Sequence, residues 1–278
     1  MRTKMIRAGL FGRPLSNSLS PEVFGTFARL TGAGIAYELR ETEASNLAAE
    51  IESARACGWC GFNVTIPHKG AVLAMLNLPD PAATAAGAVN AVRFGRAGLE
   101  GLNTDARALL QAFDRQAIQV SGKATAVFGA GGAAGAAGWA LGRSRAASVA
   151  ILARDQGRAG RLAGRLAERF PETIFSAGPF AAPAGTPDIV VNATPIGMYS
   201  QAALPFTPRP GCVCADFAYA QGGTEFIRAA TAAGAVTVDG LELLVAQAAL
   251  SLKFWTGLPG GDIVKFCGEA MSLLLRGK

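Results

Sequence analysis

The stretch ATAVFGAGGAAGAAGWAL, residues 124–141, changes its pattern twice within a short length of chain. It opens with an apolar run of strand length, continues through a glycine-rich turn and ends in an alanine-rich segment of helix formers. The turn, GAGGAA at 129–134, has the GxGxxA spacing that joins a strand to a helix in dinucleotide-binding folds. This order predicts a strand, a phosphate-binding turn and a helix in one unit.

Each small residue of this turn has a separate physical role. Gly129 permits the tight turn, Gly131 lets the backbone approach a pyrophosphate, and Ala134 allows close packing of the helix on the strand. The helix would point its first N–H groups and its positive dipole end at the phosphates. A glycine-rich turn without a ligand has the same spacing, but the strand, helix and second strand around it favour a cofactor site. The predicted cofactor contacts are Gly129, Ala130, Gly131, Gly132 and Ala133.

Basic residues at the end of the next predicted strand favour NADP over NAD. An NAD-binding fold usually has an acid at this point, which holds the ribose hydroxyls. Here Ala153 takes that position, Arg154 follows it, and Arg158 lies one turn further on. A guanidinium can stack on adenine and pair with a 2′-phosphate. Asp155 leaves NAD open, because a carboxylate that points inward would repel this phosphate.

Strand and helix patterns continue on both sides of this unit. After it we predict a helix over 156–169, a Pro/Gly-rich loop at 177–187, a helix near 224–233, a helix from 241 onward, and strands at 148–154, 188–194, 212–217 and 235–238. Before it, strands at 7–12, 36–42 and 61–67 alternate with helices over 20–30, 44–56 and 69–77. Segments 88–94 and 99–105 flank Gly95 and Gly98 and predict a hairpin. Ser20 and Pro21 read as the N-cap and first residue of the first helix.

These patterns predict an α/β fold of two domains. The first, residues 1–105, is a substrate-binding α/β domain with a mostly parallel sheet. The second, 106–240, is a Rossmann domain that binds NADP, and 241–278 are C-terminal helices that return to the first domain.

Composition narrows the class of protein. Half of the 278 residues are hydrophobic and 17% are charged, so a core can form, and the net charge of +6 suits a small anionic ligand. No basic block with interleaved aromatic residues predicts nucleic-acid binding, and no apolar run is long enough for a membrane span or a signal peptide. We therefore expect a soluble cytoplasmic protein with a small-molecule substrate, either monomer or homodimer.

The cysteines and the one histidine do not predict a metal or redox site. Cys57 and Cys60 have CxxC spacing, but Gly58 fits the end of a helix and Cys60 the start of a strand. A redox CxxC usually has its first cysteine at a helix N-terminus. His68 is not spaced to complete a zinc site with cysteines, so we predict no metal.

A lysine and an aspartate follow strands of the first domain. Lys69 follows NVTIPH and Asp105 ends GLNTD, and the carboxyl ends of strands in an open α/β sheet line the ligand crevice. The carboxylate would orient the ammonium, which would exchange a proton with a substrate hydroxyl. An ordinary salt bridge or two unrelated surface charges remain open from these two residues alone. Ser18 and Ser20, at a predicted helix N-terminus, suit a substrate carboxylate. Further polar side chains near strand ends or in an apolar helix are Asn63, Thr65, Asn90, Asn103 and Gln247.

Seven motifs in order resemble the shikimate dehydrogenase family over nearly the whole chain. They are SLSP at 18–21, NVTIPHK at 63–69, GAVNA at 87–91, NTD at 103–105, GAGGAA at 129–134, NATPIGM at 192–198 and GLELLVAQAA at 240–249. The resemblance implies reversible NADPH-dependent reduction of 3-dehydroshikimate to shikimate, a step of chorismate and aromatic amino acid biosynthesis.

The resemblance also implies a role for each site residue. Lys69 and Asp105 would be the catalytic pair, and Ser18 and Ser20, assisted by Tyr219, would hold the substrate carboxylate. Ring hydroxyls would be bound by Asn63, Thr65, Asn90 and Gln247, and Met198 and Gly240 would lie near the nicotinamide. His68 would be supporting structure.

Several positions depart from the family pattern: Asn17, Ala91, Leu102, Ala106 and Ala153. None of them removes a catalytic group. They leave open an NAD-using quinate/shikimate dehydrogenase, or a paralogue that prefers a different hydroxy acid. A sensor that binds a dinucleotide without turnover is the other class of function, and the Ser–Lys–Asp set argues against it.

Overall fold

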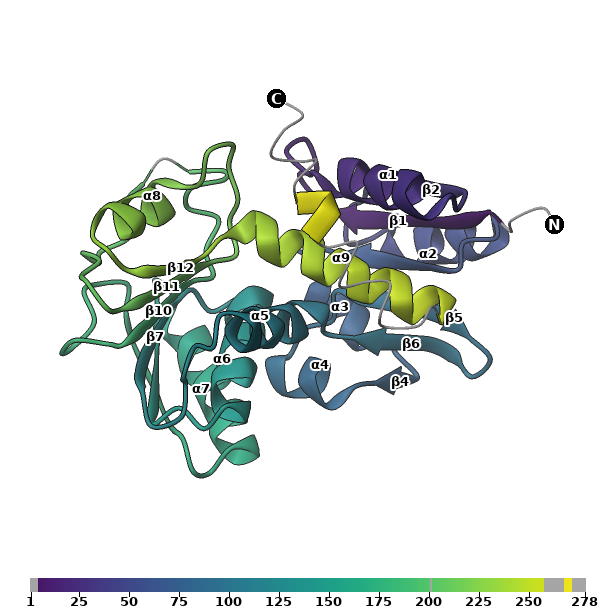
Figure 1. Cartoon of the computed structure of the whole chain (residues 1–278). Helices are drawn as coiled ribbons and strands as arrows, with labels where there is room; N and C mark the ends of the chain where they lie inside the picture. Colours follow the sequence, from purple (N-terminus) through teal and green to yellow (C-terminus); the bar gives the residue numbers. More distant parts are fainter. Residues whose placement is uncertain (1–4, 201, 258–267, 272–278) are drawn as a thin grey trace. The chain divides into compact units, whose positions relative to one another are not determined.

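The computed structural model describes residues 5–200, 202–257 and 268–271 (Figure 1). The described chain forms two compact units. The first contains residues up to Thr84, 88–104 and those from Val245 onward, and the second contains Ala85–Gly87 and Asp105–Leu244. Residues 258–267, which include Cys267, and 272–278 lie outside the described residues. The predicted C-terminal helices, 241–278, are therefore described only up to residue 257 and at 268–271.

The first unit is built on a mixed sheet with the strand order β2-β1-β3-β5-β6-β4. Pairs β1–β2, β1–β3 and β4–β6 are parallel, whereas β5 is antiparallel to both neighbours. The strands are β1 Ile6–Gly12, β2 Ile35–Glu41, β3 Gly61–Val64, β4 Leu78–Pro79, β5 Ala91–Gly95 and β6 Gly98–Leu102. The helices of this half of the chain are α1 Ser20–Thr31, α2 Leu47–Ala56, α3 Lys69–Leu73 and α4 Pro81–Ala86.

Helices α1 and α2 pack on opposite faces of this sheet. Strand residues alternate between the two faces. On one face the ring of Phe24 from α1 stacks on Tyr37 of β2, with ring centroids 4.1 Å apart. On the other, the apolar stripe of α2 joins a core with Phe11 and Trp59. Gly9 is required there, because a Cβ at this position would lie 2.2 Å from the Trp59 ring.

The second unit has a fully parallel sheet with the order β12-β11-β10-β7-β8-β9. Its strands are β7 Ala124–Phe128, β8 Ser148–Ala153, β9 Ile174–Pro179, β10 Ile189–Asn192, β11 Val213–Asp216 and β12 Val236–Val238. The remaining helices are α5 Thr104–Arg115, α6 Gly132–Arg143, α7 Gln156–Arg169, α8 Glu225–Ala232 and α9 Gly240–Thr256. This order of strands and helices is a doubly wound nucleotide-binding fold, as predicted.

The last turns of α9 belong to the first unit. The Trp255 indole N–H donates to the carbonyl of Val92 on β5 at 2.9 Å, and Arg93 donates to the carbonyl of Phe254 at 3.1 Å.

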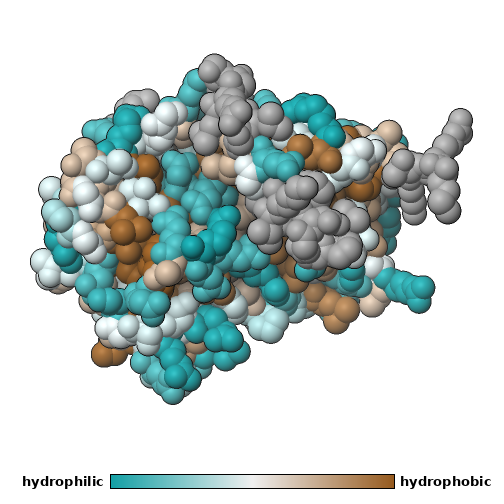
Figure 2. All heavy atoms as spheres, viewed as in Figure 1, coloured by the Kyte–Doolittle hydropathy of each residue, from teal (hydrophilic) through white to brown (hydrophobic). Residues whose placement is uncertain are grey.

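No described helix has the length and apolar content that crossing a bilayer requires. On the face drawn in Figure 2, hydrophobic residues lie in separate groups among hydrophilic and intermediate ones.

Some predicted boundaries are wrong. Ser20 is the first residue of α1 and not its N-cap, which is Leu19. Strand β3 ends at Val64, and α3 ends at Leu73 rather than near 77. Residues 104–105, predicted in a strand, begin α5. The sequence patterns also missed β4, α4 and β9, which are short or lie at a sheet edge.

Candidate functional site

A buried polar network lies where β3 and β5 meet α9 in the first unit. Asn63 on β3 is 4% exposed. Its amide nitrogen donates to the Asn90 carbonyl at 2.9 Å and to the Ser251 hydroxyl at 2.8 Å. Its amide oxygen accepts from the Tyr37 hydroxyl at 2.9 Å. An amide has two N–H donors and two acceptor lone pairs, so Asn63 retains capacity for one more donor, such as a substrate hydroxyl.

Asn90 and Thr104 form a reciprocal pair next to this network. The Asn90 side-chain nitrogen donates to the Thr104 hydroxyl at 2.9 Å, and the backbone N–H of Thr104 donates to the Asn90 side-chain oxygen at 2.6 Å. The Thr104 hydroxyl also lies 3.5 Å from Oε1 of Gln247 on α9. Both members of the pair are at most 3% exposed. The start of α5 is therefore fixed to the segment before β5.

Lys69 is held through its backbone by the same segment. It is the first residue of α3, and its carbonyl accepts from the N–H of Val89, the neighbour of Asn90, at 3.1 Å. His68 precedes it, is 2% exposed, and donates from Nε2 to the Thr42 carbonyl at 2.7 Å. This is a structural contact, and it fixes the turn from β3 into α3. Thr65 lies in that turn, and its methyl group fills the space over Gly12.

The serine pair forms a hydrogen-bonded turn at the start of α1. The Ser18 hydroxyl oxygen accepts from the backbone N–H of Ser20 at 3.3 Å, and the Ser18 N–H donates to the Leu15 carbonyl at 3.0 Å. Ser18 is half-buried, so its O–H remains available as a donor, whereas Ser20 is 6% exposed. Pro21 in the first turn of α1 removes one N–H that would otherwise need an acceptor.

The predicted site residues divide between the two units. Ser18, Ser20, Asn63, Thr65, Lys69, Asn90 and Gln247 belong to the first. Asp105 is the second residue of α5, is 9% exposed, and belongs to the second unit with Tyr219 and the predicted cofactor residues.

The glycine-rich turn in the second unit has the backbone that a phosphate site needs. Gly129 has φ +115°, and a Cβ there would lie 2.7 Å from the Ala193 carbonyl oxygen. Gly131 caps α6 with φ −93° and ψ −166°, and a Cβ there would meet nothing within 4 Å. Residues 130–133 are half-buried and Ala134 is fully buried. The first N–H groups of α6 have no intrahelical acceptor, so this open turn fits a pyrophosphate.

The basic residues after β8 fit the further phosphate of NADP. Arg154 and Arg158 are exposed, and neither forms an ion pair within the residues that the structure describes. The Asp155 carboxylate, which had left NAD open, accepts from the backbone N–H of Arg158 at 2.9 Å and caps α7. This carboxylate is engaged with its own helix, and arginines lie on both sides of it in the chain, at Arg154 and Arg158.

A buried carboxylate, which sequence patterns did not single out, organises the loops after β10 and β11. Asp216 is 0% exposed and accepts from the Thr224 hydroxyl at 2.6 Å, from the Ala218 N–H at 2.8 Å and from the Asn192 amide at 2.8 Å. Burial raises the pKa of this carboxyl to about 7, against the lowering effect of its three donors. The only sequence signal for it was an acid at the end of an apolar strand.

Two predicted nicotinamide residues lie in or beside these loops. Asn192 also donates to the Ile196 carbonyl at 3.1 Å, which shapes the turn leading to Met198. Gly240 starts α9, and a Cβ there would lie 2.0 Å from the Ala218 carbonyl oxygen. Asp216 therefore supports the backbone on which Met198, Tyr219 and Gly240 are placed.

Comparison with known proteins identifies relatives of the whole chain. Residues 10–92 match the family model described as the shikimate dehydrogenase substrate binding domain. A curated NADP(+) shikimate dehydrogenase of Anaeromyxobacter sp. (strain Fw109-5) is 40% identical over 267 residues, which are 90% of each chain.

Solved structures agree with the fold. A shikimate dehydrogenase in complex with NADP+ has a TM-score of 0.86 at 29% identity, over 98% of this chain and 96% of that one. The Thermus thermophilus shikimate dehydrogenase in complex with NADP(H) and shikimate has a TM-score of 0.80 at 31% identity, over 96% of this chain and 100% of that one. A 5-ketofructose reductase of Gluconobacter sp. strain CHM43 scores 0.80 at 31% identity, over 96% and 99%.

Proposed function

The chain belongs to the shikimate dehydrogenase family, and we propose that it catalyses the reversible NADP-dependent reduction of 3-dehydroshikimate to shikimate. This reaction is a step of aromatic amino acid biosynthesis, which is the role we propose for the protein. NADPH supplies the hydride when it is bound. The chain must then bind the ring, exchange one proton with the oxygen at C3, and hold the cofactor phosphates.

Lys69 and Asp105 are the proposed proton-transfer pair. In the reduction, the Lys69 ammonium donates its proton to the oxygen that gains charge as the hydride arrives, and Asp105 orients the ammonium and the resulting hydroxyl. The observation that carries this proposal is the bridge at residues 89–90. Val89 bonds the backbone of Lys69, and Asn90 bonds both sides of Thr104, the residue before Asp105. One short segment thus bonds the backbone of Lys69 and both the backbone and the side chain of Thr104, all within the first unit.

Hydroxyl and amide groups of the first unit are proposed to bind the substrate. The Ser18 and Ser20 hydroxyls suit the carboxylate, with Tyr219 assisting, because a carboxylate accepts hydrogen bonds only. Thr65, Asn90 and Gln247 suit ring hydroxyls, which both donate and accept. Asn63 has one acceptor position left after its bonds to Tyr37, Asn90 and Ser251, so we propose that it accepts from a single hydroxyl.

The turn at 129–133 is proposed to hold the pyrophosphate, and Arg154 and Arg158 the 2′-phosphate. Neither guanidinium forms an ion pair within the part of the chain that the structure describes, so each can give a phosphate a charge-assisted hydrogen bond of about 1.5–3 kcal/mol. Met198 and Gly240 are proposed to border the nicotinamide. Gly240 suits that place because its backbone already packs against the Ala218 carbonyl, without room for a side chain.

A different hydroxy-ketone substrate is the second candidate. The similarity to a 5-ketofructose reductase is as high as that to one of the shikimate dehydrogenases, at 31% identity in both cases. Ala91 and Leu102, which depart from the family pattern, are paired across β5 and β6 next to the proposed hydroxyl-binding residues. Activity assays with shikimate, quinate and open-chain polyols, each with NADP+ and NAD+, separate these candidates.

The test of the proposed reaction is Lys69→Ala. We expect kcat for shikimate oxidation to fall by about 10²–10⁴, the contribution of a general acid–base group, while the Kd of NADPH stays unchanged. Lys253→Ala is the control, because Lys253 is an exposed lysine on α9 with no proposed role. Full turnover in Lys69→Ala would remove the proton-transfer role of this residue.

A further inference from the structure

Tyr37 on β2 belongs to the polar network of Asn63, although no predicted site residue lies on β2. Its hydroxyl donates to the Asn63 amide oxygen at 2.9 Å. Its ring stacks on Phe24 of α1, with centroids 4.1 Å apart, and lies 6.5 Å from the ring of Trp255 on α9. Those two rings stack on each other at 5.6 Å. Aromatic packing therefore holds the phenol ring, and a phenylalanine in its place would keep that packing.

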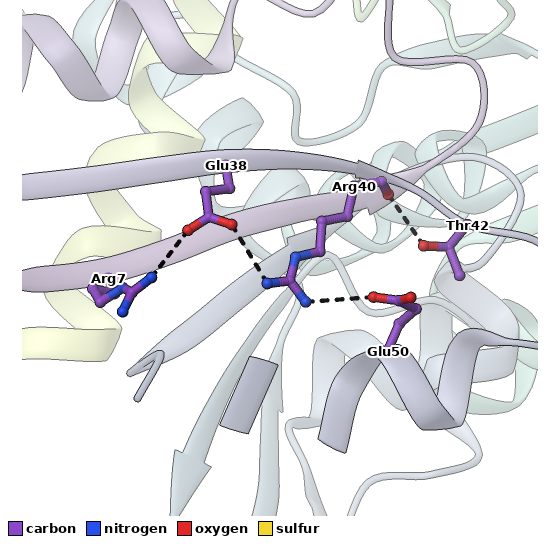
Figure 3. A network of polar contacts seen from close by, with 5 residues as sticks. All are labelled: Arg7, Glu38, Arg40, Thr42 and Glu50. Carbon is purple, nitrogen blue, oxygen red and sulfur yellow. Dashed lines mark hydrogen bonds and ion pairs between the residues drawn. The ribbon is translucent and has the colours of Figure 1, made fainter. Parts of the chain in front are cut away.

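The opposite face of β2 is held by charged side chains, which Figure 3 shows. Glu38 contacts Arg7 of β1 and its neighbour Arg40, each at 3.4 Å. Arg40 contacts Glu50 of α2, also at 3.4 Å. Successive strand residues point to opposite faces, so Tyr37 lies on the face away from Glu38. Since β2 is also paired with β1 along its whole length, the strand that carries the Tyr37 hydroxyl is fixed on both faces and along its paired edge.

The partners of Asn63 determine which end of its amide is the oxygen. The backbone carbonyl of Asn90 can only accept, so the side-chain atom 2.9 Å from it is the nitrogen. The Ser251 hydroxyl donates its own proton to the backbone carbonyl of Gln247 at 2.9 Å. It therefore accepts from the second N–H of Asn63, at 2.8 Å. Both donors of the amide are engaged, and its oxygen has one lone pair left beside the bond from Tyr37.

We propose that Tyr37 and Ser251 are positioning residues, and that they make Asn63 a single acceptor for one ring hydroxyl of the substrate. This role rests on the proposed function and adds a selectivity to its binding site. A hydroxyl can donate to the remaining lone pair of Asn63. A ketone, an ether or a fluorine in the same place would set two acceptors against each other, because both N–H groups of Asn63 are engaged. The site thus rejects a substrate that lacks a donor at this position.

The test compares wild type with Tyr37→Phe in the oxidation of shikimate and of two analogues, which lack the hydroxyl at C4 or at C5. Phenylalanine keeps the ring, so only the O–H is lost. KM for shikimate should rise about three- to tenfold, the effect of one lost hydrogen bond, with kcat changed less than about twofold. With one of the two analogues the substitution should leave KM unchanged, because the hydroxyl that would meet Asn63 is already absent.

A merely structural role of Tyr37 would raise KM by the same factor with all three substrates, and that result would overturn the proposal. An unchanged KM for shikimate would also overturn it. So would a loss of the effect with both analogues, since Asn63 has one acceptor position. A wild-type chain that does not oxidise shikimate would instead remove the proposed function, and the arrangement of the amide is then tested without substrate.

Hydrogen exchange of the Asn63 side-chain NH₂, followed by NMR, is that second measurement. Ser251→Ala removes the acceptor of one N–H, so this exchange should become at least about tenfold faster than in wild type. Thr231→Val is the matched control, because the Thr231 hydroxyl also donates to the carbonyl four residues before it, that of Ile227, at 2.9 Å on α8. Unchanged exchange in Ser251→Ala, or equal acceleration in Thr231→Val, would refute the role of Ser251.

Discussion

We expect Asp216 to make the free energy of unfolding depend on pH, and Asp216→Asn to remove its part of that dependence. The substitution keeps the shape of the side chain. The amide oxygen of the variant can accept from the Ala218 N–H and the Asn192 side-chain amide. Its NH₂ can donate to the Thr224 hydroxyl oxygen. That oxygen already accepts from the Ile227 N–H and has a second lone pair. The bonds from Ala218 and Asn192 are therefore retained in a neutral group, and the bond with Thr224 reverses its direction.

The magnitude follows from the pKa of the Asp216 carboxyl in the two states. Burial raises this pKa from 3.8 to about 7 in the folded state. Between these values the unfolded chain loses the proton and the folded chain keeps it, so the free energy of unfolding falls as pH rises and is constant again above the folded pKa. From pH 5 to pH 8 this amounts to roughly 2–3 kcal/mol.

The assay is urea unfolding at pH 5, 6, 7 and 8, with wild type and variant compared at each pH. Asp239 and Glu242 also have pKa values raised by burial, so their contribution must be subtracted through this comparison. The free energy of unfolding of Asp216→Asn relative to wild type should rise by roughly 2–3 kcal/mol from pH 5 to pH 8. Asp114→Asn, at an exposed carboxylate on α5, is the control for removal of a charge. Parallel curves for wild type and Asp216→Asn would refute a raised pKa at Asp216.

Four further variants test the proposed cofactor and substrate sites. Arg158→Ala should raise KM for NADPH about tenfold and change KM for NADH far less, since only NADPH has the phosphate that this guanidinium would meet; equal effects on both cofactors would exclude that contact. Gly129→Ala should lower stability by about 1–3 kcal/mol because its φ is +115° and its Cβ would contact the Ala193 carbonyl, whereas Gly131→Ala should leave stability unchanged and weaken NADPH binding, as titration and urea unfolding can separate. Ser18→Ala should raise KM for shikimate with little change in kcat, because holding a carboxylate is largely uniform binding; an unchanged KM would count against this anchor.

The fold was predictable where periodicity and turn residues agree. The run at 124–141 predicted β7, the turn and α6, and the structure has them at Ala124–Phe128 and Gly132–Arg143. Strand β9, Ile174–Pro179, was missed because it lies at the sheet edge and ends in glycine and proline, so it has neither a buried run nor clean alternation. Ser20 was read as an N-cap from residue type alone. The turn at Leu15–Ser20 instead places the Ser18 hydroxyl on the Ser20 N–H.

The site was predictable to the extent that a residue type alone indicates its chemistry. Glycines at fixed spacing and arginines directly after a strand indicate phosphate binding. Thr104, Ser251 and Tyr37 carry no such signal, because a hydroxyl in a helix or strand is compatible with many surroundings. Their contribution depends on contacts between residues far apart in sequence, such as the bond from Asn63 to Ser251. Asp216 was missed for the same reason, since its burial follows from packing and not from its neighbours in the chain.

The hydrogen bonds of Asn90 explain why an asparagine suits the centre of the polar network in the first unit. Its carbonyl accepts from the Val64 N–H and the Asn63 amide, its N–H donates to the Leu102 carbonyl, and its side chain both donates to and accepts from Thr104. An aspartate in this place could accept from the Thr104 N–H but could not donate to its hydroxyl, and it would add a negative charge beside the residue that precedes Asp105. A leucine would leave the Thr104 N–H without its acceptor in a site that is 0% exposed, at a cost of about 1–3 kcal/mol. The backbone of Asn90 joins β3 to β6, and its neutral side chain, with one donor and one acceptor, adds the start of α5 to that junction. The proposed pairing of Lys69 with Asp105 depends on this junction.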